Sequence, residues 1–202
     1  MYTKTKFSGL ALAFALLLSV LTIASPQNIY AASELVETKG SSAEVEFKGG
    51  TLSLAQVAAF DFGQQTITSG STDYEAVSVG DDIQVSDLRG TGSGWDLNVS
   101  LSAFTGTDNG KELTGAYVTL SGTQVAGVNG TIGTAPTSPS TISLKLDSDG
   151  EETPIFIASE DAGMGVWGIT TGLTDAKLTV LPGTAYADTY EANLTWTLQT
   201  TP

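Results

Sequence analysis

The sequence predicts an all-β fold, a β-sandwich or sandwich-like barrel of about 8–12 mostly antiparallel strands. Three observations support this prediction. Glycine, serine and threonine make up 72 of the 202 residues, a composition typical of strands joined by many turns. Apolar and polar residues alternate with a period of two in several segments, and no stretch shows a convincing helical period. Turn-forming sequences separate these segments at intervals.

The alternation locates the strands. Residues 95–101 place every second, apolar side chain on one face, as in a half-buried strand. Residues 142–147 and 194–199 alternate in the same way. Shorter strands are expected, in order, at residues 44–47, 51–55, 59–62, 116–120, 155–158 and 176–180.

Turn sequences connect these strands. Asp108-Asn109-Gly110 and Asn129-Gly130 contain the Asn-Gly pair that accepts positive φ in tight hairpins, and residues 147–150 should also form a turn. The segment 133–140, with two prolines, is expected to be a loop between two groups of strands. Neither group has enough apolar surface for its own core, so residues 45–202 are predicted to form a single domain.

The N-terminal residues 1–32 have the features of a secretory signal peptide. Lys4 and Lys6 precede an apolar run at 10–23, and cleavage is expected after Ala31 or Ala32. The run has about fourteen residues, whereas a membrane-spanning helix needs about 20, so no membrane association is expected after cleavage. Residues 33–44 then form a short N-terminal lead. Export without any cysteine fits a Gram-positive surface better than a eukaryotic secretory route.

Composition and charge argue against several classes of function. Cysteine and histidine are absent, which excludes disulfide scaffolds, thiolate or imidazole metal sites and mechanisms with a histidine base. No catalytic motif is present, so the protein is expected to be neither an enzyme nor a cofactor-binding protein. Loss of the signal would leave six basic residues against 22 acidic ones, a net charge of −16. This charge disfavours nucleic acids and anionic lipids as ligands.

Two Trp-x-Leu triplets lie in predicted strands, Trp95-Asp96-Leu97 and Trp196-Thr197-Leu198. Together with the segments 85–90, 94–99, 113–116 and 190–198 in this order, they resemble the WxL domain of Gram-positive surface proteins. The resemblance covers roughly residues 45–202. It implies a secreted protein attached non-covalently to the cell wall through peptidoglycan, beside other surface proteins of the same gene cluster. An alternative is a subunit of a surface complex, or a host-directed adhesin, that partner proteins hold to the wall.

The residues of the two triplets have two interpretations. Trp95 and Leu97 share a strand face with other apolar residues, as do Trp196 and Leu198, which indicates that the indoles point into the core. The alternative is that one or both indoles stack on sugar rings at a strand surface.

Three further features are candidates for contact with a ligand. Trp167 lies among glycines at 163–168, which favours a loop or strand end where an indole is exposed, and it is the leading candidate for ligand contact. Arg89, the sole arginine, is expected to pair with a carboxylate, with ligand contact as the alternative. Acidic residues at 147–152, 81–82 and 160–161 are interpreted as solvated turns, with weak divalent binding possible at the last two pairs, and no metal site is predicted.

Overall fold

Antiparallel strands form almost all of the regular structure in the computed structural model, which describes residues 37–121, 123–145 and 151–201. The chain divides into two units, Met1–Glu44 and Val45–Pro202. Every strand of the described residues belongs to the second unit. The predicted signal peptide and residues 33–36 of the lead lie outside the described residues. No helix in the described part of the chain is long and apolar enough to cross a bilayer.

The described residues contain fifteen strands and one short 3-10 helix, η1 (Leu173–Asp175). The strands are β1 (Leu52–Gln56), β2 (Phe60–Asp61), β3 (Thr72–Glu75), β4 (Ser78–Val79), β5 (Ile83–Asp87), β6 (Trp95–Leu101), β7 (Thr105–Gly106), β8 (Tyr117–Ser121), β9 (Gln124–Gly127), β10 (Thr141–Lys145), β11 (Thr153–Ala158), β12 (Gly165–Thr170), β13 (Ala176–Val180), β14 (Tyr190–Glu191) and β15 (Leu194–Thr200). The all-β prediction is confirmed. The strands outnumber the expected 8–12 because β4, β7 and β14 are two-residue pairings too short to show alternation.

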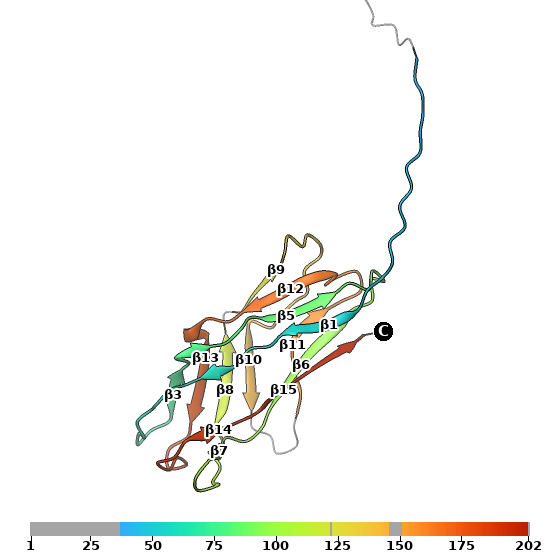
Figure 1. Ribbon diagram of the computed structural model, residues 1–202. Coiled ribbons are helices and arrows are strands. Elements are labelled where there is room, and N and C mark those ends of the chain that lie inside the picture. The colour runs from blue at the N-terminus through green and yellow to red at the C-terminus, as the bar shows by residue number, and fades with distance from the viewer. Residues whose placement is uncertain (1–36, 122, 146–150, 202) are drawn as a thin grey trace, which may run out of the picture. The chain divides into compact units, whose positions relative to one another are not determined.

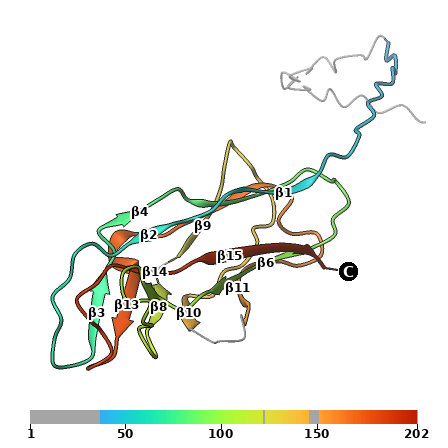
Figure 2. The ribbon, with the colours of Figure 1, turned by 60° about the horizontal axis from the view of Figure 1, so that its bottom comes forward.

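The strands form three larger sheets, in the orders β1-β5-β12-β9, β10-β8-β13-β3 and β11-β6-β15. Two further two-stranded ladders pair β14 with β7 and β2 with β4. Each sheet of the described residues has two open edges, so the arrangement is a sandwich of open sheets and not a barrel. Figure 1 shows the sheets by strand label, and Figure 2 shows β1 on one side of the domain and β6, β11 and β15 on the opposite side.

The core lies between the sheets and follows the predicted alternation. Ile83 and Val85 of β5 are buried at 1% and 0% exposure, and Trp95, Leu97 and Val99 of β6 are all at 0%. Strands from both sides of the 133–140 segment share sheets, since β12 pairs with β5 and β13 pairs with β3. The segment therefore connects strands without separating them into two groups.

One predicted strand is absent. Residues 44–47 alternate like a strand, but they form no ladder among the described residues, and Val45 and Phe47 are 71% and 88% exposed. Alternation shows which side chains would share a face, but it does not supply a neighbouring strand. Four strands of four residues or more, β3, β5, β9 and β12, had no counterpart in the prediction. Glycine in β9 and β12 hid their strand character.

Candidate functional site

The two Trp-x-Leu triplets lie on neighbouring antiparallel strands. β6 is the central strand of its sheet, and β15 pairs with it in a register that sets Leu198 opposite Leu97 and Trp196 opposite Val99. Directly opposed residues share a sheet face, so Trp95, Leu97, Trp196 and Leu198 all lie on the face toward the core. The two motifs thus form one apolar patch built from segments about a hundred positions apart in the chain.

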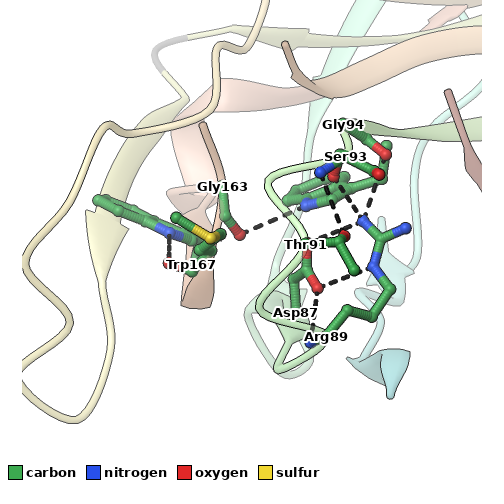
Figure 3. A network of polar contacts seen from close by, with 9 residues as sticks. Asp87, Arg89, Thr91, Ser93, Gly94, Gly163 and Trp167 are labelled. Atoms are coloured by element: carbon green, nitrogen blue, oxygen red, sulfur yellow. Dashed lines mark hydrogen bonds and ion pairs between the residues drawn. The ribbon is translucent and has the colours of Figure 1, made fainter. Parts of the chain in front are cut away.

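Trp95 is a core residue in this structure. Its side chain is 0% exposed, and its ring meets Phe156 edge-on, with centroids 5.0 Å apart and an interplanar angle of 85°. The indole Nε1 donates to the carbonyl oxygen of Gly163 at 3.3 Å, which satisfies the only polar group of the ring (Figure 3). Trp196 differs, because it is only half buried at the margin of the core.

Arg89 pairs with a carboxylate, as one of its two interpretations predicts. Its Nε and Nη2 donate to the two oxygens of Asp87 at 2.9 and 2.8 Å, a bidentate pair. Nη2 also donates to the carbonyl oxygens of Ser93 and Gly94 at 2.7 and 3.3 Å (Figure 3). The hydrogen bonds of the guanidinium therefore hold the connection between β5 and β6 in place. This connection leads directly into Trp95, whose side chain lies in the core.

The ion pair shifts the pKa values of both partners. Burial alone would raise the pKa of the Asp87 carboxyl, but hydrogen bonds and the positive charge from Arg89 outweigh it and hold that pKa below its usual value. The hydrogen bond to Asp87 raises the pKa of Arg89. Asp87 is 3% exposed, so the pair is a structural device within the fold.

The prediction that Trp167 is exposed on a loop or at a strand end is wrong. Trp167 lies within β12, opposite Val85 of β5 and Gly127 of β9, and only 5% of it is exposed. Its Nε1 donates to the carbonyl oxygen of Met164 at 2.9 Å. An indole so buried and already hydrogen-bonded offers almost no surface to a ligand.

The acidic clusters do not gather into a metal site among the described residues, where no three acidic side chains are close enough to share an ion. Asp81 and Asp82 are exposed, as are Glu160 and Asp161. The cluster at residues 147–152 falls partly outside the described residues, which include only Glu151 and Glu152 of it.

A groove of about 990 Å³ lies away from the motif patch. Apolar residues of the core contribute to its lining, and the segments 60–70 and 181–193, called its two walls below, supply most of the rest. Six aromatic residues line it: Phe60, Phe62, Tyr74, Phe104, Tyr186 and Tyr190. Asp61, Asp188 and Glu191 add carboxylates, and Gln64, Gln65 and Asn193 add amides. Aromatic faces beside polar donors and acceptors are the usual composition of a small-molecule or glycan site.

Hydrogen bonds hold both walls of this aromatic groove. On one wall the Tyr74 hydroxyl donates to the carbonyl oxygen of Thr66 at 3.0 Å. On the other wall the backbone N–H of Tyr186 donates to the hydroxyl oxygen of Tyr190 at 2.9 Å. Tyr186 is 50% exposed as a residue, and the Lys111 ammonium lies 3.8 Å from the centroid of its ring.

Asp188 ties the second wall to the turn after β7. Its carboxylate accepts backbone N–H bonds from Thr189, Asn109 and Asp108 at 2.8, 3.0 and 3.3 Å. Burial alone would raise the pKa of Asp188, but these hydrogen bonds keep it below its usual value. The carboxylate is thus an anchor for the wall, with most of its lone pairs already engaged.

Sequence reasoning missed the aromatic groove. Its residues come from segments more than a hundred positions apart, and alternation within each segment cannot show that they meet. The available signal was the density of aromatics in Phe60-Asp61-Phe62 and at Tyr186 and Tyr190.

A family model for the WxL domain, described as surface and cell wall-binding, matches residues 25–202. Comparison with curated proteins and with solved structures found no significant match. The matched range includes both Trp-x-Leu motifs, at Trp95 and Trp196. The chain therefore belongs to the WxL family of surface, cell wall-binding domains.

Proposed function

We propose that this surface protein attaches to the wall by binding the glycan strands of peptidoglycan in the aromatic groove, after export directed by its N-terminal signal from a Gram-positive cell. The observation that carries the proposal is the exposed ring of Tyr186 beside Tyr190 in a groove that also presents amides and carboxylates. The apolar face of a sugar packs on such a ring, and its hydroxyl and acetamido groups find polar partners beside it.

The charge of the groove supports a neutral ligand. Asp61, Asp188 and Glu191 make its lining acidic, and the whole chain has a net charge of −14. Phosphate-rich wall polymers would be repelled by these carboxylates. Uncharged sugar rings are tolerated, because stacking and hydrogen bonding to them do not depend on net charge.

The test is co-sedimentation of residues 33–202 with insoluble peptidoglycan stripped of teichoic acid and protein. Tyr186→Ala should weaken binding between about twofold and tenfold, since aromatic stacking contributes about 0.5–1.5 kcal/mol. Tyr186→Phe keeps the ring and should bind like the unaltered chain. Ile132→Ala, at a position 95% exposed and outside the groove lining, is the matched control.

Two outcomes would contradict the proposal. Absence of saturable pelleting by the folded chain would shift the function to the alternative, a surface complex or adhesin held by partner proteins. Equal binding by Tyr186→Ala and the unaltered chain would remove the aromatic groove as the site. Release of soluble muropeptides would contradict the further expectation that the protein binds without catalysis.

A further inference from the structure

β15, which carries the second Trp-x-Leu triplet, is an edge strand. It pairs with β6, and no other strand of the described residues borders it. The backbone N–H of Thr201 donates to the carbonyl of Gly94, and the N–H of Ser102 donates to the carbonyl of Asn193. Hydrogen-bonded pairs of an antiparallel ladder recur at every second residue, so the backbone N–H and C=O groups of the odd-numbered residues of β15 point toward β6. The backbone groups of Leu194, Trp196 and Leu198 therefore point outward from the sheet.

This edge lacks the usual protection. The seven residues of β15, LTWTLQT, include no charged residue and no proline, whereas the edge strand β3 has two carboxylates and the edge strand β11 contains Pro154. Trp196 and Leu198 are only half buried. An added strand would satisfy the outward backbone groups and cover both side chains.

The segment Val45-Glu46-Phe47-Lys48 has the properties of a strand that could pair with this edge. It alternates apolar and charged residues like a strand, yet it has no ladder partner among the described residues. Val45 and Phe47 are 71% and 88% exposed, and both would lie on one face of an extended chain. Paired with β15, that face would cover Trp196 and Leu198.

The same pairing would place the charged side chains of both strands on one face. The carboxylate of Glu152 accepts a hydrogen bond from the hydroxyl of Thr197, on the face of β15 opposite Trp196. With Val45 and Phe47 on the core side, Glu46 and Lys48 lie on this outer face. The ammonium of Lys48, one of few basic groups in the chain, then has a carboxylate on the same face.

The direction of the strands indicates that the segment pairing with β15 comes from a second copy of the protein and not from the same chain. The N–H of Gly50 donates to the carbonyl of Leu88, and that of Thr201 donates to the carbonyl of Gly94. The C-terminal ends of the segment and of β15 are thus both tied to the β5–β6 connection, which would make pairing within one chain parallel. Antiparallel pairing is the more stable arrangement per residue, and a second copy can supply it.

We propose that residues 45–48 of one copy add to the outer edge of β15 in a second copy, and that the exchange is reciprocal in a symmetric dimer. The proposal is independent of wall binding, because the aromatic groove shares no residue with this contact. It assigns the second Trp-x-Leu strand a role in assembly in addition to its place in the sheet.

The first test is light scattering on residues 33–202 over a range of concentrations. The unaltered chain should dimerise, and Val45→Lys with Phe47→Lys should raise the dimer dissociation constant more than about tenfold, since two apolar contacts are lost. Both positions are exposed in the single chain, so folding should be unaffected. Ile132→Lys, 95% exposed elsewhere, should still dimerise. A chain that stays monomeric at every concentration would overturn the proposal.

The second test locates the contact. The protein has no cysteine, so single cysteines can be introduced without side reactions. A mixture of the Phe47→Cys and Leu198→Cys variants should form a disulfide between copies, whereas Ile132→Cys with Leu198→Cys should not. A dimer that forms without the first disulfide would also overturn the assignment. Peptidoglycan pelleting of the lysine variant, measured in parallel, should remain saturable and sensitive to Tyr186→Ala, although the monomer lacks the avidity of a dimer, which keeps the two proposals separable.

Discussion

At the scale of single residues, Gly163 decides how the first motif packs. Its φ is +73°, and its carbonyl oxygen accepts the hydrogen bond of the Trp95 indole. A Cβ atom added to Gly163 would lie 2.6 Å from the Cβ of Ala158 and 2.8 Å from Nε1 of Trp95. Neither neighbour can retreat, because both belong to the buried core.

Gly163→Ala is therefore expected to lower the free energy of unfolding by about 2–4 kcal/mol, from overpacking and left-handed strain together. Urea denaturation followed by circular dichroism measures the loss. Gly110→Ala is the matched control, since Gly110 has a φ of +65° with nothing within 4 Å of an added Cβ, and only the strain remains. Equal losses in the two variants would contradict the packing argument.

The ionisation of Asp87 makes the free energy of unfolding depend on pH in the acid range. Its pKa in the folded chain lies below its usual value, so the folded state binds fewer protons than the unfolded state in acid. The contribution is complete above the unfolded pKa of about 3.9 and is lost as pH falls through the lower folded pKa. Stability supplied by the pair with Arg89 should thus persist at neutral pH and disappear in strong acid.

Asp87→Asn should accordingly cost about 1.5–3 kcal/mol at pH 7, with the difference from the unaltered chain shrinking below about pH 4. Urea denaturation between about pH 7 and pH 3 gives the profile. Asp82→Asn removes the same charge at an exposed position and controls for net charge. A difference that stays constant down to the lowest pH would show that the carboxylate charge is unimportant.

At the scale of elements, the sequence could predict strands with strong alternation and failed where packing decided. Residues 95–101 and 176–180 coincide with β6 and β13, because each places apolar side chains on one buried face. β12 was missed because three of the six residues 163–168 are glycine, a composition that suggests a loop. In the structure, Gly165 and Gly168 allow β12 to pack closely against Thr131 and Val128. The aromatic groove was missed because its walls meet only in three dimensions.

The two motif strands should differ in their sensitivity to substitution. β6 is central and Trp95 is fully buried, whereas β15 is an edge and Trp196 is half buried. Trp95→Ala is expected to cost about 3–5 kcal/mol of stability, and Trp196→Ala less than half as much. Guanidinium denaturation of the two variants tests this order. Equal losses would show that the position of a strand in its sheet does not determine how much its motif tryptophan contributes to stability.

At the scale of the whole molecule, the protein combines a strongly acidic composition with a cell wall-binding domain. Its 22 acidic residues exceed its eight basic ones, and the family match makes it a surface, cell wall-binding domain. A wall that carries teichoic acid would repel a protein of this net charge, so general electrostatic attraction would not supply the affinity. Binding must then come from short-range contacts, which salt screens little.

Affinity for purified peptidoglycan should therefore change less than about threefold between roughly 0.01 M and 0.15 M salt, over which the Debye length falls from about 30 to about 8 Å. Binding to intact walls that retain teichoic acid should strengthen over the same range, because salt screens the repulsion between phosphates and the carboxylates of the protein. Co-sedimentation on both materials measures the two trends. A steep loss of affinity for peptidoglycan over this range would mean that exposed charges, and not ring stacking in the aromatic groove, hold the protein to the wall.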